Sequence, residues 1–517
     1  MRESKIYHMM VSLNQLKWNV TYKGVLVGLF SGLLVALYRF GIEAGVEQSL
    51  VLYRYLRANP IAIAPWVLLI AVVGYFVHRL IQYEPYAKGS GIPQVEGIVL
   101  LGMKMKWQSI LCVRFIAGIV TAFFGVSLGR EGPSIQIGAL GSKALTQKFS
   151  QSKLEENYLI TAGASAGLSA AFNAPLSGIM FALEEVQKSF SPNLLISVTT
   201  AALSADVVSK FIFGLKPVLG FSVIPQLPLQ HYLLLLPLGV VCGAIGVLVN
   251  KSLLGIERFY QHIPTALHPG FALLVALACG IFLPDSLGGG QNLVRMSETA
   301  QLGISMAAVY LIVKLFFTSV CFGSGIPGGI FMPILSMGAL CGTIFGQAVY
   351  YMGVSQQFIS IFCVCAMAGV MAGSVKSPIT SILLMAEMTG SLVHLLPVAV
   401  VAFVALLTSD LLNTNPIYEE LLERIAPKGA KHPNPKAKGT MIEVAVELGS
   451  TIAGKQIKDI SLPKGVLVVG LRRGNREVVP YGDTLILQGD YLMVLSQHGD
   501  FNEMNALLLE LCHAPSV

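Results

Sequence analysis

A charged motif at residues 129–133, with the sequence Gly-Arg-Glu-Gly-Pro, interrupts a long apolar stretch of the chain. A carboxylate at bilayer depth costs about 2.5–3.5 kcal/mol on insertion scales, so it is tolerated mainly where it faces a cavity or a partner. Pro133 suits the first turn of a helix, and the two flanking glycines allow the backbone to approach a ligand closely. The motif therefore predicts a helix N-terminus that faces an anion, with Glu131 as the functional side chain. The alternative is a kinked membrane helix in which Arg130 and Glu131 form a salt bridge.

The composition of the chain supports this membrane setting. Of its 517 residues, 54% are hydrophobic and 12% are charged, whereas about 25% of residues are charged in soluble domains. We assign the formal net charge of +7 to loops on the cytoplasmic side, not to nucleic-acid binding. Most cysteines lie in apolar segments, which favours buried small side chains over disulfides or a metal site: Cys112, Cys242, Cys279, Cys321, Cys341, Cys363 and Cys365.

Apolar segments recur along the chain after a mildly basic N-terminal segment without a signal-peptide pattern. The first two are long enough to cross a ~30 Å hydrocarbon core. Shorter apolar segments that follow residues 89–94 and 173–175 are interrupted by glycine and proline, as in discontinuous membrane helices. The main apolar segments are 24–40, 61–81, 110–128, 131–145, 194–213, 232–248, 270–283 and 305–322.

The second half of the chain repeats features of the first. The sequence Gly-Ser-Gly-Ile-Pro occurs at 89–93 and again at 323–327. A proline is followed at the same spacing by a glutamate in both halves, as Pro175 and Glu184 and as Pro378 and Glu387. The pattern indicates a duplication, and paired broken segments point to a binding site in the middle of the membrane.

Four elements together resemble the anion site of the CLC chloride channel and transporter family: residues 89–93, 129–133, 329–333 and the late Tyr418. They occur in the family's order, and the resemblance covers roughly residues 20–425. It implies an all-α polytopic membrane domain with inverted repeats and broken helices, a homodimer with one anion pathway in each subunit, and no enzymatic activity. The glycines and prolines of these motifs would set the backbone conformation of the anion site: Gly89, Gly91, Pro93, Gly129, Gly132, Pro133, Gly329 and Pro333.

The resemblance also implies how chloride is bound. The hydroxyls of Ser90 and Tyr418 and the backbone N–H groups of Ile330 and Phe331 would be its donors. This chemistry is reasonable, because one helix terminus contributes about 0.3–2 kcal/mol and several must converge to offset the desolvation of an anion. The alternatives are that Ser90 only caps a helix and that Tyr418 is an interfacial aromatic residue. A serine in the first motif is typical of chloride over nitrate, and the motifs depart from those of the fluoride-exporting branch.

Within the same resemblance, Glu131 is the gate that competes with chloride and carries a proton. Arg130 and Arg114 would add positive potential along the pathway, and an interhelical ion pair is the alternative for Arg114. Proton-coupled members have a second glutamate that delivers protons, whereas channels usually have an apolar residue there, so Glu185 favours exchange. Glu184 and Glu387 are expected to be structural.

The sequence therefore predicts a secondary transporter that exchanges chloride for protons in a lipid bilayer, with no cofactor, no metal and no nucleic acid. A passive voltage-gated or pH-gated chloride channel is the alternative. A third hypothesis is a membrane-anchored sensor in which the C-terminal part carries the function.

The chain changes character after Tyr418, where residues 426–439 form a charged, proline-containing linker. The part from 440 to 517 predicts a small α+β domain with strands at 442–446, 465–473, 484–487 and 491–495 and a final helix at 501–512. It resembles the TrkA-C (RCK C-terminal) domain, whereas many eukaryotic chloride transporters have paired CBS domains. Such modules commonly dimerise and bind small effectors, including cyclic dinucleotides. Arg472 and Arg473 would meet a phosphate, or else form a solvated strand edge.

The predicted organisation is an N-terminal cytoplasmic segment at 1–22, a CLC-like membrane domain at 23–425, the linker at 426–439 and a TrkA-C-like regulatory domain at 440–517. This combination suggests a bacterial protein of the plasma (inner) membrane with both termini in the cytoplasm.

Overall fold

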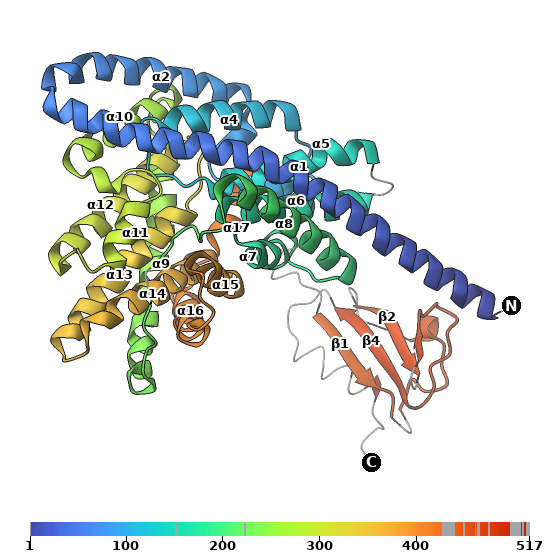
Figure 1. Ribbon diagram of the computed structural model, residues 1–517. Helices are drawn as coiled ribbons and strands as arrows, with labels where there is room; N and C mark the ends of the chain where they lie inside the picture. The colour runs from blue at the N-terminus through green and yellow to red at the C-terminus, as the bar shows by residue number, and fades with distance from the viewer. Residues whose placement is uncertain are drawn as a thin grey trace. The chain divides into compact units, whose positions relative to one another are not determined.

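The computed structural model of the chain describes residues 2–149, 153–221, 224–426, 440–447, 450–460, 462, 466–473, 476–496, 508 and 511–512. The chain forms two compact units, Met1–Ala426 and Pro427–Val517. The first is helical and the second contains a β-sheet, as Figure 1 shows. Both features confirm the predicted fold class.

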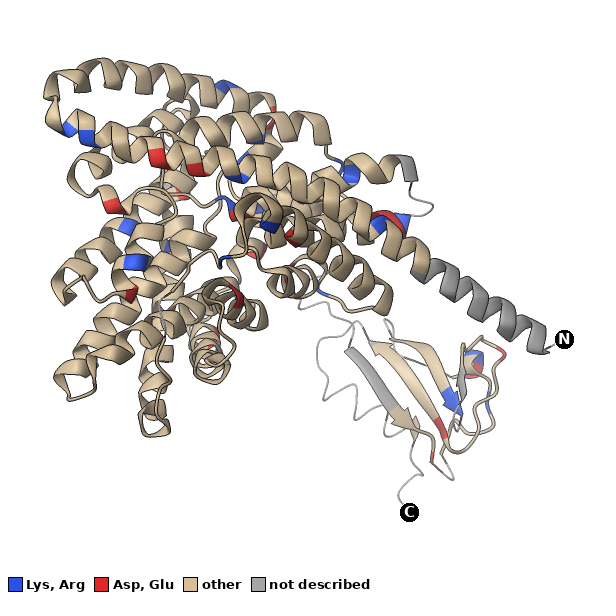
Figure 2. Cartoon of the chain, in the orientation of Figure 1, with Lys and Arg blue, Asp and Glu red and all other residues tan. Residues whose placement is uncertain are grey.

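Helices of very different lengths build the first unit (Figure 1). Among the described residues, eight segments are long and apolar enough to cross a membrane, and charged residues are sparse throughout this unit (Figure 2). The helices that contain these segments are α1 (Arg2–Ala58), α2 (Ile63–Tyr83), α8 (Pro192–Phe213), α9 (Leu235–Tyr260), α10 (His268–Phe282), α12 (Ile304–Gly323), α13 (Phe331–Tyr351) and α14 (Ile359–Val375). The other longer helices are α4 (Trp107–Ala122), α5 (Glu131–Phe149), α6 (Lys153–Phe172) and α16 (Leu395–Leu411).

Short helices complete the unit. Proline lies in the first turn of α3, α7 and α15, where its missing N–H group removes no helical hydrogen bond. The short α-helices are α3 (Ile92–Leu101), α7 (Pro175–Phe181), α11 (Gln291–Glu298), α15 (Pro378–Thr389) and α17 (Ile417–Ile425), and the π-helix η3 (Ala182–Gln187) continues α7. The 3-10 turns are η1 (Pro60–Ala62), η2 (Pro85–Ala87), η4 (Leu229–Leu234), η5 (Thr265–Leu267), η6 (Pro284–Ser286), η7 (Gln356–Phe358) and, in the second unit, η9 (Ile457–Asp459).

Several helix limits differ from the predicted ones. Helix α1 runs without interruption from Arg2 to Ala58, so no helix end coincides with the predicted boundary at residue 22, and the first span continues past residue 40. Helix α4 ends at Ala122, because a turn follows in which Gly125 adopts a φ of +68°. Apolar character alone does not locate such ends, since loops inside a membrane protein are also apolar.

The two halves of the helical unit meet at an isolated antiparallel bridge between Gly129 and Gly329, directly before α5 and α13. This bridge makes the α12–α13 junction the counterpart of the α4–α5 junction. The two identical pentapeptides are therefore not equivalent, because 89–93 precedes α3 whereas 323–327 follows α12. Treating them as copies of one element was wrong, although they are neighbours: Gly89 N donates to Gly325 O at 3.4 Å.

The core of the helical unit is apolar and rich in small residues. Helix α14 is buried along nearly its whole length, and it packs against α13, α9 and α16. Cys242, Cys321, Cys341, Cys363 and Cys365 are buried free thiols, as expected, but Cys112 is exposed on α4.

The second unit contains a four-stranded antiparallel sheet in the order β1-β4-β2-β3. Its strands are β1 (Thr440–Ala445), β2 (Val466–Arg473), β3 (Arg476–Val478) and β4 (Asp490–Ser496). The strand predicted at 484–487 was wrong: Leu485 makes only one bridge, with Gln456, and the Leu487 N–H group donates to the Asp490 carboxylate. Most of the helix predicted at 501–512 lies outside the described residues. Within that range, residues 508, 511 and 512 are described and are helical.

Candidate functional site

The glycine-rich motifs meet at one point in the helical unit. Gly129 and Gly329 exchange two backbone hydrogen bonds, each with an N–O distance of 2.7 Å, and Gly328 N donates to Gly89 O at 3.1 Å. These contacts bring together the first residues of α3, α5 and α13. The first N–H groups of a helix have no partner within it and carry partial positive charge, so this point suits an anion.

Two glycines are required for this close approach. A Cβ atom on Gly132 would lie 2.5 Å from Ser90 Oγ and 3.2 Å from the Cα atom of Gly329. Gly91 has a φ of +96°, a left-handed conformation that favours glycine, and a Cβ atom there would lie 2.9 Å from Arg114 Nη2. A side chain at either position would push the motifs apart.

The residues predicted to bind chloride lie around this point. Ser90 and Tyr418 are buried, and neither hydroxyl makes a hydrogen bond of normal geometry to a residue that the structure describes. The Tyr418 ring stacks on Phe331 with a centroid distance of 6.1 Å, and Ile330 is the N-cap residue of α13. Buried polar groups rarely lack partners, so two such hydroxyls beside helix N-termini fit an anion site. Neither residue matches its alternative: the Ser90 side chain caps no helix, and Tyr418 is fully buried.

Glu131 is the first residue of α5 and is only 1% exposed. Its carboxylate folds back over Gly129 and lies beside the backbone N–H group of Met332 in the first turn of α13. Neither of its oxygens has a hydrogen bond of normal geometry to a described residue. The carboxylate therefore lies where an anion would be stabilised by two helix N-termini.

Arg130 forms its ion pair with Glu43 of α1. Arg39, one turn earlier on α1, also contacts the Glu43 carboxylate. These residues line a cavity of about 330 Å³ that reaches Glu131. The alternative of an Arg130–Glu131 salt bridge is therefore wrong, while the positive charges remain close enough to act on Glu131.

Arg114 is fully buried in α4. Its guanidinium donates to the carbonyl oxygens of Gly89 at 2.7 Å and Ser90 at 3.2 Å, and to the side chain of Gln136. No carboxylate pairs with it among the described residues, so the alternative of an interhelical ion pair is wrong. Arg114 instead holds the loop that presents Ser90.

Glu185 lies on the π-helix η3 and is 4% exposed. One carboxylate oxygen accepts a hydrogen bond from Ser377 Oγ at 2.7 Å. π-Helical turns are rare and are frequent at functional sites. Glu185 and the adjacent Glu184 both contact the start of α15, Glu185 through the hydroxyl of the N-cap residue Ser377 and Glu184 through backbone N–H groups.

Glu184 and Glu387 have matching structural contacts. The Glu184 carboxylate accepts from the N–H groups of Ile379 and Thr380 at the start of α15. The Glu387 carboxylate accepts from Leu176 and Ser177 at the start of α7. Each glutamate thus caps the helix of the other half, in agreement with the structural role expected for both.

Among the described residues, the sequence analysis missed two fully buried ionisable groups. Glu96 on α3 is fully buried, and neither of its oxygens makes a hydrogen bond to a described residue. Lys314 on α12 is also fully buried and donates to the carbonyl oxygens of Ser286 and Gly288. The insertion-cost argument that singled out Glu131 applies to both, because both lie in apolar helices.

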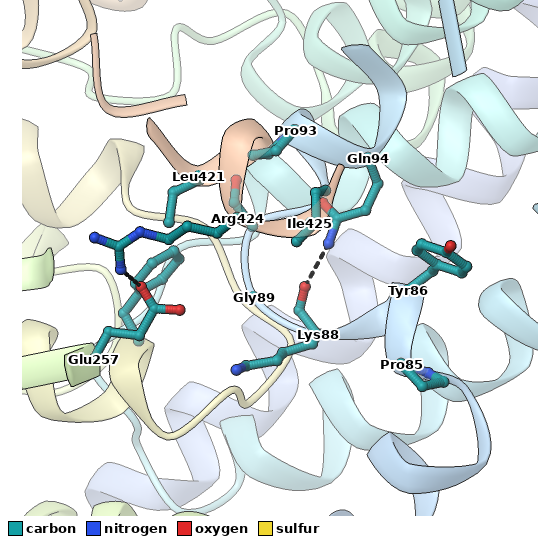
Figure 3. Close-up of a pocket in the computed structure, with 12 residues that line it drawn as sticks. Pro85, Tyr86, Lys88, Gly89, Pro93, Gln94, Glu257, Leu421, Arg424 and Ile425 are labelled. Atoms are coloured by element: carbon teal, nitrogen blue, oxygen red, sulfur yellow. Dashed lines mark hydrogen bonds and ion pairs between the residues drawn. The ribbon is translucent and has the colours of Figure 1, made fainter. Parts of the chain in front are cut away.

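Two cavities flank α17. One, of about 340 Å³, is lined by Ser90, Lys88, Leu421, Arg424 and Glu257 among others, and Figure 3 shows Arg424 paired with Glu257 at its edge. The other, of about 560 Å³, is lined by Glu184, Glu185, Lys188 and Glu419 among others. Ser90 and Glu185 are thus approached through separate cavities.

Arg472 and Arg473 both contact other residues of the second unit. Arg473 forms a two-point ion pair with Asp490, with N–O distances of 2.8 and 2.7 Å. Burial alone would raise the pKa of Asp490, but hydrogen bonds from Arg473 and the Leu487 N–H group lower it below its usual value. The Arg472 guanidinium lies over the Tyr491 ring at 4.5 Å. Phosphate binding by this pair stays a prediction.

The fold defines a multi-pass membrane protein in which several helix N-termini converge on one buried point. A model of the family described as "Voltage gated chloride channel" matches residues 67–410, and a TrkA-C domain model matches residues 441–509. The chain belongs to the CLC family and has a C-terminal TrkA-C domain. It is not an enzyme.

Named relatives are bacterial. The chain is 34% identical over 384 residues to the H(+)/Cl(-) exchange transporter ClcA of Salmonella paratyphi C, which covers 71% of this chain and 81% of that protein. It is also 34% identical over 370 residues to ClcA of Salmonella arizonae, covering 70% and 78%.

Solved structures show the same fold. A slow cyanobacterial Cl-/H+ antiporter superposes with a TM-score of 0.74 at 26% identity, covering 78% of this chain and 97% of that one. A CLC-type fluoride/proton antiporter superposes with a TM-score of 0.64 at 22% identity, covering 77% and 96%.

Proposed function

We propose that the protein exchanges chloride for protons across the membrane. The observation that carries this proposal is the position of Glu131, a buried carboxylate over Gly129 at the N-termini of α5 and α13. Chloride and the ionised carboxylate are stabilised by the same N–H groups, so they compete for one place.

Ser90, Tyr418, Ile330 and Phe331 would bind chloride through two hydroxyls and two backbone N–H groups. Because these donors are neutral, chloride can bind without being held too tightly to leave. Protonation of Glu131 removes its charge and its attraction to the helix ends, so chloride can replace it. One side chain then links the movement of both ions.

Glu185 supports exchange over a passive channel. It is a buried acid that, like Glu131, acts electrostatically on Tyr418, and its own cavity gives protons a route separate from the cavity beside Ser90. The ClcA relatives and the similar cyanobacterial antiporter are named for the same activity. A serine at position 90 and the sequence of the gate motif favour chloride over nitrate and fluoride.

We further propose a homodimer in the bacterial inner membrane with both termini in the cytoplasm. Large apolar side chains are exposed on α8 and α16, among them Val207, Phe211, Phe403 and Leu407. Such a surface suits lipid or a second subunit. The TrkA-C domain would be cytoplasmic and would respond to a small effector such as a cyclic dinucleotide.

The decisive experiment records chloride and protons together in liposomes that contain the purified protein. We expect a proton gradient alone to drive chloride against its own gradient, with a fixed ratio of the two fluxes. Protein-free liposomes are the control, and replacing chloride with fluoride tests ion choice. If chloride moves only down its gradient, the protein is a passive channel.

A further inference from the structure

Lys188 occupies an unusual position at the end of the π-helix that carries Glu185. It is the C-cap residue of η3 and has a φ of +51°, a left-handed conformation that is uncommon for residues other than glycine. Its Nζ atom lies 2.5 Å from Glu419 Oε1, and the two side chains are 30% and 42% exposed. The pair connects η3 to α17 at the cavity that reaches Glu185.

Several carboxylates act on Lys188. Lys188 interacts electrostatically with Glu96 on α3, with Glu185 on η3 and with Glu419 on α17. Glu96 and Glu184 also act on Glu185. The Glu96 oxygens make no hydrogen bond to a described residue, whereas the Glu184 carboxylate is occupied by the start of α15. The remaining groups that face Glu185 are the Ser377 hydroxyl, with which it is hydrogen-bonded, and Tyr418.

The positive charge of Lys188 affects how readily Glu185 takes up and releases a proton. A group that takes up and releases protons works best when its two protonation states are close in free energy at the ambient pH. A nearby cation favours the ionised state of a carboxyl, whereas a nearby carboxylate disfavours it. Lys188 and Glu419 therefore have opposite effects on Glu185, although they form one ion pair.

We propose that Lys188 sets the pH range over which Glu185 exchanges protons with its cavity, an inference that rests on the proposed chloride–proton exchange. Lys188 acts through Glu185, so it is a positioning residue and not itself a proton carrier. The lysine keeps the proton-delivering carboxyl from holding its proton too tightly.

The test measures the rate of coupled exchange in liposomes over a series of symmetrical pH values. Lys188→Met removes a positive charge, so Glu185 keeps its proton to higher pH and the profile should move about half to one pH unit upward. Glu419→Gln removes a negative charge and should move the profile downward by a similar amount. Lys188→Arg keeps the charge and should restore the wild-type profile.

Lys376 offers a matched control. It lines the same cavity and also has a left-handed backbone, with a φ of +65°, but its Nζ atom pairs with Asp410 at 2.5 Å. It is not among the charges that act most strongly on Glu185. Lys376→Met should therefore leave the pH profile in place.

A purely structural ion pair gives a different result. In that case Lys188→Met and Glu419→Gln break the same contact, so both lower the rate in the same way, and the inference is overturned. If the wild-type protein couples the two fluxes but neither Lys188→Met nor Glu419→Gln shifts the pH profile, the inference is also overturned. The proposed function is then left intact. A wild-type protein that does not move protons overturns the proposed function itself.

Discussion

The regions around Gly129 and Gly329 have the same backbone design. In each half a buried cation precedes the glycine at the same spacing, Arg114 in α4 and Lys314 in α12. Arg114 donates to carbonyl oxygens of the loop before α3, and Lys314 donates to those of the loop before α11. Both halves therefore fix a loop and start a helix at the central bridge by the same means.

Two pairs of equivalent positions have side chains that differ in charge. The residue that starts the helix is Glu131 in the first half and Phe331 in the second. Beyond the paired caps Glu184 and Glu387, the next residue is an acid in the first half, Glu185, and Met388 in the second. The repeat thus supplies helix ends that suit an anion, and its asymmetry concentrates the ionisable groups in one half.

The largest expected effect comes from removing the acid at the central bridge. Glu131→Gln leaves a neutral side chain at the start of α5, as Phe331 is at the start of α13. Chloride should still pass, while proton flux should fall by about 100-fold or more, because a positioned proton-transfer group contributes about that much to a rate. Paired chloride and pH recordings in liposomes would measure both fluxes. A variant that still moves protons in a fixed ratio to chloride would show that the gate lies elsewhere.

The second test removes the other acid that lacks a counterpart. Glu185→Gln makes this position neutral, as Met388 is in the other half, and should lower proton flux by about 10-fold while chloride flux stays close to wild type. A ratio of proton to chloride flux equal to that of the wild-type protein would exclude Glu185 from proton delivery. Met388→Leu, a substitution of similar volume, is the matched control.

The smallest effect is expected at the shared caps. Glu184→Ala and Glu387→Ala each remove hydrogen bonds to two backbone N–H groups, so each should lower the free energy of unfolding by about 1 kcal/mol. Thermal unfolding of the purified protein would show similar losses for both, with the flux ratio unchanged. A change of ratio in Glu184→Ala alone would give that residue a part in proton delivery.

Local sequence predicted the broken helices well where proline and glycine mark their ends. The half-helix that opens at Pro175 and closes on Glu184 and Glu185 is present as α7 and η3. The end of α4 was not predictable in this way, because apolar residues continue beyond Ala122. The end of α1 was placed too early, because the helix continues past residue 40 through a stretch that contains charged residues and ends only before Asn59 and Pro60. The strand predicted at 484–487 failed because the Asp490 carboxylate takes the backbone N–H group of Leu487.

The sequence by itself determined that this is a polytopic membrane protein of a known family, since low charge and four linked motifs are local properties of the chain. It also singled out Glu131, because a carboxylate in an apolar segment is costly wherever that segment folds. Glu185 was singled out by the resemblance to proton-coupled members of the family. Only the tertiary structure decided that Arg130 pairs with Glu43, that Arg114 holds the Ser90 loop and that Lys188 pairs with Glu419. These partners lie on different helices, and the approach of distant segments depends on packing that no local pattern encodes.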